Sequence, residues 1–332
     1  IYTLKNIRGA SFSDDSSILW DITAAKENAN GFDVLLEGSD GTSKEGENYI
    51  WSTNSSGVIN ASSGWLTDEQ TESDSNGYEN KFGKDFNNDG LISGGSAYQL
   101  LGSSGIYTLK NSSGRTFSDD TSSAWDVTAA KETGSGFDVL LEGADGTSLE
   151  GKNYIWSTNS SGVITSASGW LTDAQTESDA NGYENKFGKD FNNDGLISGG
   201  SAYQLLGSSG IYTLKNSSGR TFSDDTSSAW DVTAAKETGS GFDVLLEGAD
   251  GTSLEGKNYI WSTNSSGVIT SASGWLTDAQ TESDANGYEN KFGKDLNNDG
   301  LISGGSAYQL LGSSGIYTCL LYTSDAADDS GC

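Results

Sequence analysis

The sequence predicts a mainly β fold, organised as a tandem array of small domains that each carry a short helix leading into an acidic loop. Three observations support this prediction. The opening Ile1-Tyr2-Thr3 returns at Ile106, Ile211 and Ile316, so the sequence repeats every 105 residues. Short runs of alternating apolar residues are separated by clusters of Gly, Ser, Asn and Asp. One segment rich in Asp and Asn recurs in each repeat.

The repeat has the length of a small domain. It exceeds the roughly 20 to 50 residues of units that must stack in a solenoid, so we expect separate domains. Strand-like segments at 203–206 and 211–214 flank a Gly-Ser-Ser-Gly turn, which predicts a hairpin across the simple repeat boundary. The predicted modules are 1–95, which lacks its first strand, 96–200, 201–305, and the start of a truncated fourth at 306–318.

Within the second repeat, alternating residues indicate the strands. Phe137, Val139 and Leu141 share one face of a predicted strand, and Tyr154 and Trp156 share a face of another. The predicted strands are 106–110, 124–132, 137–142, 153–158 and 163–166. A helix is predicted at 182–189, because Tyr183 and Phe187 stand four residues apart and can pack together before the acidic loop.

The acidic loop has the pattern D-x-N-x-D-G-x-I, at 85–92, 190–197 and 295–302. Side-chain oxygens at positions one, three and five, a glycine at six and a backbone carbonyl at seven can surround a cation of calcium size. The sequence therefore predicts calcium as the cofactor. The predicted ligands are Asp85, Asn87, Asp89 and Leu91; Asp190, Asn192, Asp194 and Leu196; and Asp295, Asn297, Asp299 and Leu301.

Position twelve departs from the usual calcium loop, because a serine stands where a bidentate carboxylate is expected. These serines are Ser96, Ser201 and Ser306. We expect the missing carboxylate to come from the predicted helix, six residues before the first Asp of each loop, at Glu79, Glu184 and Glu289. The alternative is an Asx-rich turn that binds no metal, since Asp and Asn favour turns in any context.

Each repeat contains three tryptophans. Side chains of this size usually form the core of a small β domain that has no disulfide. The alternative is that one tryptophan in each repeat stacks on a sugar ring. The candidates for sugar stacking are Trp65, Trp170 and Trp275, which follow a Ser-Gly pair.

Composition excludes several classes of function. The net charge of −29 disfavours nucleic acid and anionic lipid as partners and favours cations. No apolar run is long enough for membrane insertion. The chain has no His, which removes the commonest general base, and carboxylate pairs are too numerous to single out a glycosidase site. We therefore expect no enzymatic activity.

The last residues, 319–332, break the repeat. They begin Cys319-Leu320-Leu321-Tyr322, and the segment resembles the translated read-through of a sequencing adapter. We predict that this tail is non-native. Both cysteines, Cys319 and Cys332, lie in it, so the repeats themselves carry no disulfide and no thiol nucleophile.

Each repeat resembles the tryptophan-rich C-terminal domain of cyanobacterial surface and exported proteins. The motifs that carry the resemblance are Trp125-Asp126, Tyr154-x-Trp156, Gly169-Trp170-Leu171, Phe187-Gly188-x-Asp190 and Asn192-Asn193-Asp194-Gly195. The loop is also similar to half of a dockerin repeat, but the second half and the acidic position twelve are absent. The resemblance implies export, calcium binding and tandem arrays.

Two functions are consistent with these features. The first is a calcium-binding array of a secreted or cell-surface bacterial protein with a structural or adhesive role, whose partners are calcium ions and either surface glycans or neighbouring copies. The second is an array of carbohydrate-binding modules attached to a catalytic domain that this sequence does not contain.

Overall fold

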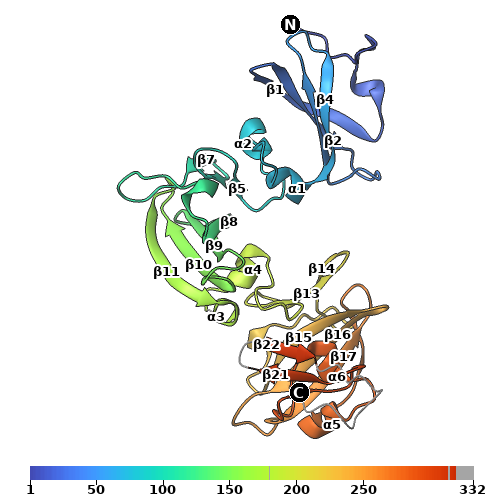
Figure 1. The fold of residues 1–332 in the computed structure, drawn as a ribbon. Helices are drawn as coiled ribbons and strands as arrows, with labels where there is room; N and C mark the ends of the chain where they lie inside the picture. Colours follow the sequence, from blue (N-terminus) through green and yellow to red (C-terminus); the bar gives the residue numbers. More distant parts are fainter. Residues whose placement is uncertain (179, 313–314, 319–332) are drawn as a thin grey trace, which may run out of the picture. The chain divides into compact units, whose positions relative to one another are not determined.

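The computed structural model describes residues 1–178, 180–312 and 315–318. It divides into two compact units, Ile1–Thr172 and Asp173–Cys332, and Figure 1 labels strands and short helices of both. Antiparallel strands dominate both units, which confirms the predicted mainly β fold. The predicted tail, 319–332, lies outside the described residues, and the predicted module boundaries stay predictions.

The first unit contains two four-stranded antiparallel sheets in which neighbours in sequence are neighbours in the sheet. The first sheet consists of β1 (Trp20–Asn28), β2 (Gly31–Gly38), β3 (Glu47–Thr53) and β4 (Ile59–Thr67). The second sheet consists of β8 (Trp125–Glu132), β9 (Phe137–Gly143), β10 (Lys152–Thr158) and β11 (Ile164–Thr172).

Short elements connect these two sheets. The helices between the two sheets are α1 (Asp68–Glu72), α2 (Tyr78–Phe82) and η2 (Asp119–Thr121), whereas η1 (Asp14–Ser16) precedes the first sheet. A three-stranded sheet is formed by β5 (Leu91–Ile92), β6 (Gln99–Gly102) and β7 (Gly105–Thr108). Strands β6 and β7 form a tight hairpin, here called the first hairpin, in which Gly102 pairs with Gly105.

The second unit repeats these elements. It begins with α3 (Asp173–Glu177), α4 (Tyr183–Phe187), β12 (Leu196–Ile197), β13 (Gln204–Gly207), β14 (Gly210–Thr213) and η3 (Asp224–Thr226). The third sheet follows, with β15 (Trp230–Thr238), β16 (Gly241–Gly248), β17 (Lys257–Thr263), β18 (Ile269–Ala272) and β19 (Leu276–Thr277). The described part ends with α5 (Asp278–Glu282), α6 (Tyr288–Phe292), β20 (Leu301–Ile302), β21 (Gln309–Gly312) and β22 (Gly315–Thr318).

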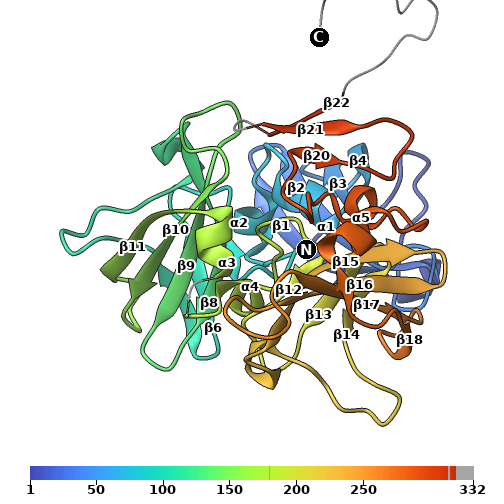
Figure 2. The same ribbon diagram turned by 90° about the horizontal axis from the view of Figure 1, so that it is seen from below.

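Strands β13 and β14 form the second hairpin, at the place where the sequence predicts one. Strands β21 and β22 form the third hairpin, which lies beside β20 in one small sheet (Figure 2). Helix α4 falls inside the predicted helix 182–189. The helix before it in each repeat was not predicted, although Thr67 and Gln70 form a capping box at the start of α1 that marks it in the sequence.

Alternate residues of a strand point to opposite sides of the sheet. In the third sheet both sides carry buried apolar residues. In the third sheet, Val232, Phe242 and Val244 pack with residues of the second hairpin. On its other face, Leu245 and Ile260 pack with Tyr288 of α6 and with other apolar residues. A hairpin therefore covers one face of the sheet, and a helix pair covers the other.

In the first unit a helix covers one face of the first sheet, and a hairpin covers one face of the second sheet. Leu35 and Ile50 of the first sheet pack with Tyr78 and Phe82 of α2. Phe137, Val139 and Leu141 of the second sheet share one cluster with the first hairpin, which confirms their predicted common face. The acidic loop thus runs from a helix pair on one sheet to the hairpin on the next sheet. None of the described helices is long and apolar enough to cross a membrane.

Candidate calcium loop

The first acidic loop begins where helix α2 ends. Gly83 terminates the helix in a left-handed conformation, with φ of 67°, and its N–H donates to the carbonyl of Glu79 at 2.7 Å. This is a common helix ending, which glycine adopts at no steric cost. The chain then enters residues 85–93, and Asn88 is also left-handed, with φ of 60°.

Hydrogen bonds within the loop turn its polar side chains inward. Asp85 Oδ2 accepts from the N–H of Gly90 at 2.9 Å, and Asp89 Oδ1 accepts from the N–H of Leu91 at 2.7 Å. Asn87 Nδ2 donates to Asp89 Oδ2 at 2.9 Å. The structure therefore brings the predicted ligand side chains at positions one, three and five to one side of a tight turn.

The other two loops repeat this geometry. Asp190 Oδ2 accepts from Gly195 N at 2.8 Å, and Asp295 Oδ2 accepts from Gly300 N at 2.7 Å. The asparagine at position three again donates to the aspartate at position five. Asn192 Nδ2 lies 2.9 Å from Asp194 Oδ2, and Asn297 Nδ2 lies 3.1 Å from Asp299 Oδ2. Leu196 N and Leu301 N donate to Asp194 and Asp299 in the same way as in the first loop. The loop conformation is thus a property of its local sequence.

One buried oxygen has no partner in the first loop. Asp85 Oδ1 lies out of contact with water and accepts no hydrogen bond from any residue that the structure describes. In the other loops the equivalent oxygens of Asp190 and Asp295 accept from the N–H of Asp194 and Asp299 at 3.2 and 3.1 Å. A buried carboxylate oxygen without a donor is costly, and a bound cation would satisfy it.

The glutamates that we expected to complete the calcium site hold the two ends of the loop. Glu79 is 1% exposed. Its Oε1 accepts from Phe86 N at 2.8 Å, and its Oε2 accepts from Ser93 N at 2.9 Å and from Ser93 Oγ. Glu184 and Glu289 make the same contacts in their loops. The described contacts of these carboxylates are therefore with loop backbone and serine, and their role as calcium ligands stays a prediction.

The first loop also contacts the sheet that follows it. The carbonyl of Asp89 accepts from Ala130 N at 2.9 Å, and the carbonyl of Gly90 accepts from Leu101 N at 2.9 Å. Gly90 has φ of 89°, and a side chain there would overlap the carbonyl oxygen of Ala130. Position six needs glycine both for the turn and for this close approach. In the second unit, Asp194 and Gly195 make the same contacts with Ala235 and Leu206.

A hollow of about 600 Å³ lies beside the first loop. Its acidic lining residues are Glu72, Asp74, Asp89, Asp119, Asp120 and Asp126. Burial, followed by the charges of Asp89, Glu79, Asp126 and Asp119, raises the pKa of Glu72 to about 7. Burial also raises the pKa of Asp89 to about 6. Crowded carboxylates of this kind make the hollow attractive to cations.

The second unit has a related cluster. Burial, followed by the charge of Asp194, raises the pKa of Glu177, and Asp224 adds to this effect. Sequence reasoning did not find Glu72, Glu177, Asp119 or Asp224, because they lie outside the loop motif. Their only signal in the sequence is recurrence at the repeat spacing, since Glu72 returns as Glu177 and Asp119 returns as Asp224.

These donors fit a calcium ion in chemical type, since calcium prefers carboxylate, amide and backbone oxygens. Asp85, Asn87 and Asp89 would supply side-chain oxygens, and Leu91 would supply its carbonyl. Among the residues that the structure describes, no three carboxylates come close enough to form a metal site by themselves. A cation here would therefore depend on the amide and backbone oxygens as well.

The sugar-stacking candidates lie half-buried at the edge of an aromatic row. The rings of Trp65 and Tyr49 are 5.2 Å apart, and Lys44 Nζ lies 4.8 Å above Trp65. Trp170 and Trp275 lie 5.1 Å from Tyr154 and Tyr259. The other tryptophans of the second and third sheets pack against the apolar clusters between each sheet and its hairpin, as expected of core residues. They are Trp125, Trp156, Trp230 and Trp261.

Comparison with protein-family models and with curated proteins finds no match for the chain. The resemblance to tryptophan-rich domains therefore stays an interpretation of the motifs, and the function rests on the geometry of the loops.

Proposed function

We propose that the chain is a calcium-binding repeat array of a secreted or cell-surface bacterial protein, with a structural or adhesive role. The observation that carries the proposal is the loop at 85–93, which turns its polar side chains inward and leaves Asp85 Oδ1 buried without a donor. The same turn forms in all three loops. A cation at this position would satisfy the orphaned oxygen and reduce the repulsion between neighbouring carboxylates.

Calcium would stabilise the fold and would take no part in a catalysed reaction. Each loop joins a helix pair to a hairpin, and in the first two loops the backbone also bonds to the following sheet. A cation that orders the loop would therefore order the contacts on both sides of it. Because the serine at position twelve supplies no carboxylate, we expect weak binding, with Kd on the order of 10⁻⁴ to 10⁻³ M.

Calorimetric titration of the whole chain with calcium tests the metal assignment. We expect three equivalents, and two in Asp194→Asn, which removes a charge from the second loop. Asp145→Asn is the matched control, since Asp145 is exposed and lies outside the loops. It should leave three equivalents. Absence of calcium binding, or an unchanged stoichiometry in Asp194→Asn, would contradict the proposal.

An adhesive or structural role is supported by repetition. The second and third repeats differ at one position, Phe191 against Leu296, so they present nearly the same surface more than once. Repeated surfaces raise the strength of attachment through effective concentration, without any new contact.

A second candidate function, carbohydrate binding, is favoured by the half-buried row of Trp51, Tyr49 and Trp65. Aromatic rings that expose a face commonly stack on sugars. A glycan array probed with the whole chain, in calcium and in chelator, separates the candidates. If glycans bind and the combined change of Trp65, Trp170 and Trp275 to alanine abolishes binding while the melting temperature holds, the sugar-binding function is favoured. Absence of any glycan signal favours the structural role.

A further inference from the structure

A polar hollow of about 370 Å³ lies in the second unit, where the second hairpin meets the third sheet. Its lining comes from the tip of the hairpin, from the turn between β15 and β16, and from the loop after β17. The lining residues that matter here are Ser209, Tyr212, Glu237, Ser240, Phe242 and Ser265. The volume falls in the range of roughly 300 to 1,000 Å³ that is typical of small-molecule sites.

Two aromatic rings supply the apolar part of this lining. The ring centroids of Tyr212 and Phe242 lie 5.7 Å apart, with an angle of 51° between the ring planes. Phe242 is 2% exposed, whereas Tyr212 is half-buried. The N–H of Phe242 donates to Thr263 Oγ1 at 3.0 Å and fixes the backbone beneath the rings. Tyr212 is therefore the ring that a ligand in the hollow can reach.

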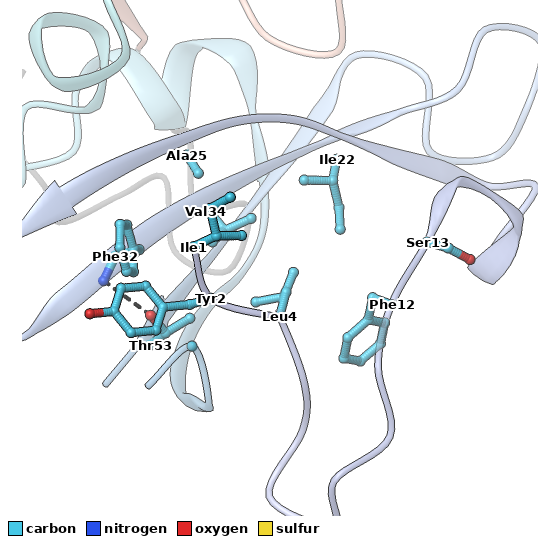
Figure 3. Close-up of a pocket in the computed structure, with 11 residues that line it drawn as sticks. Ile1, Tyr2, Leu4, Phe12, Ser13, Ile22, Ala25, Phe32, Val34 and Thr53 are labelled. Carbon is cyan, nitrogen blue, oxygen red and sulfur yellow. Dashed lines mark hydrogen bonds between the residues drawn. The ribbon is translucent and has the colours of Figure 1, made fainter. Parts of the chain in front are cut away.

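The same aromatic pair is present in the other two sheets. Tyr107 and Phe137 also lie 5.7 Å apart in the second sheet. In the first sheet the distance between Tyr2 and Phe32 is again 5.7 Å, and Figure 3 shows this pair with the hydrogen bond from Phe32 N to Thr53 Oγ1. The pair is thus a constant feature of the repeat.

A carboxylate beside the rings is held in place by the hairpin. Glu237 Oε2 accepts from Ser208 N at 2.8 Å, and its Oε1 accepts from Ser208 Oγ at 3.1 Å. In the first unit, Glu132 Oε2 accepts from Ser103 N at 2.8 Å in the same way. Because these bonds orient the carboxylate before any ligand arrives, binding to it costs little side-chain entropy.

The rings and the carboxylate meet over one glycine of the hairpin. A side-chain carbon added to Gly207 would lie 2.8 Å from Phe242, 3.1 Å from Tyr212 and 3.3 Å from Oε1 of Glu237. At Gly102 of the first hairpin, the three equivalent side chains would meet such a carbon at 2.9 to 3.2 Å. The first and second hairpins therefore bring an aromatic pair and a carboxylate together with the same geometry.

This combination of groups suits a sugar ring. The faces of a pyranose carry C–H groups that pack on an aromatic ring, and its edge carries hydroxyl groups. The carboxylate of Glu237 can accept hydrogen bonds from these hydroxyls, and the hydroxyls of Ser209, Ser240 and Ser265 can both donate and accept. None of the described residues that line the hollow is cationic, and the chain has a net charge of −29, so an anionic sugar is disfavoured.

We propose that the hollow at the tip of the second hairpin, and its equivalent at the first hairpin, each bind one pyranose ring of a neutral glycan. The inference rests on the second candidate function, carbohydrate binding, and assigns it to residues that include none of the tryptophans. It does not involve the acidic loops, so sugar binding should be the same in calcium and in chelator.

Saturation-transfer NMR of the whole chain tests the proposal. The probes are glucose, galactose, mannose and N-acetylglucosamine, and we expect at least one of them to bind. Changing Glu132 and Glu237 together to glutamine should weaken binding about tenfold or more, because each site loses a charged hydrogen-bond acceptor. Changing Ser135 and Ser240 together to arginine should abolish binding, because a long side chain then fills each hollow. Both serines are exposed, so this variant should fold.

Each variant has a matched control at exposed positions outside the lining of the hollow. The control for the glutamine variant is Asp145→Asn combined with Asp250→Asn. The control for the arginine variant is Ala167→Arg combined with Ala272→Arg. Both controls should bind sugar as the unmodified chain does.

Three results would overturn the proposal. The first is that none of the four sugars binds, and the second is that ethylamine, a cationic probe, binds more tightly than the sugars. The third is that binding survives the glutamine and arginine variants and is lost only when Trp170 and Trp275 are changed to alanine. That third result would keep carbohydrate binding but place it at the tryptophans. Calorimetric titration with calcium reports separately on the acidic loops.

Discussion

At the scale of single residues, the acidic side chains around the loop differ in their contacts. Glu79 holds the loop ends through hydrogen bonds, whereas Asp85 and Asp89 point into the turn. Glu72 belongs to neither group and lies in the hollow beside the loop. The surroundings of each carboxylate therefore determine its role, and each role can be tested separately.

Glu79 is expected to stabilise the loop in the absence of any metal. Changing Glu79, Glu184 and Glu289 together to glutamine leaves one acceptor oxygen where two are needed. We expect each site to lose about 1 to 3 kcal/mol, because a buried N–H loses its acceptor. Denaturant unfolding in chelator measures this loss. The control is Glu69→Gln, at an exposed position of α1, which should change stability little.

Glu72 predicts how stability depends on pH. Its pKa rises from 4.5 to about 7 in the folded chain, mainly through burial. The folded state therefore binds this proton more tightly than the unfolded state does. The stability that it contributes is fully present below about pH 4.5 and is lost as the pH rises to about 7. The raised pKa of Asp89 acts in the same direction between its ordinary 3.8 and about 6.

Denaturant unfolding at several pH values in chelator should show this fall, and Glu72→Gln should make the profile flatter. Calcium should also reduce the fall, because a nearby cation favours the charged carboxylates. A profile that Glu72→Gln leaves unchanged would show that Glu72 does not titrate in this range.

At the scale of elements, the loop is a joint between a helix pair and the following sheet. Its backbone contacts Ala130 closely enough to exclude a side chain at Gly90. Gly9 has a similar φ of 84°, but no atom lies within 4 Å of the position that a side chain would take. These two glycines separate the effect of backbone conformation from the effect of packing.

Gly90→Ala should therefore destabilise the chain more than Gly9→Ala. Both changes place a side chain on a left-handed residue, which costs about 1 to 2 kcal/mol. Only Gly90→Ala also forces the loop away from Ala130, which adds about 1 to 3 kcal/mol. Denaturant unfolding of both variants measures the difference. Equal losses of unfolding free energy in the two variants would mean that Gly90 does not contact Ala130 closely in solution.

At the scale of the whole molecule, calcium is expected to raise thermal stability through all three loops. A ligand at ten times its Kd stabilises the folded state by about 1.4 kcal/mol at each site. Differential scanning calorimetry should show a higher melting temperature in calcium than in chelator. The shift should vanish when Asp85, Asp190 and Asp295 are all changed to asparagine, and persistence of the shift would place calcium elsewhere.

Several features of this protein follow from local sequence patterns, because they depend on residues close together in the chain. The hairpin turn at 207–210 and the helix at 183–187 are local patterns, and the structure contains both. The loop conformation is also local, since its hydrogen bonds join residues two to five positions apart. Alternation likewise predicted the common face of Phe137, Val139 and Leu141.

Tertiary structure alone decided which surfaces cover one another. Alternation shows that a strand has two faces but does not say what lies on each, so the helices on one face and the hairpin on the other came only from the packing. The hollow beside the loop likewise joins Glu72 to Asp119 and Asp126, which are far apart in the chain. Contacts of this range depend on how sheets and helices pack, and neither periodicity nor local motifs carry that information.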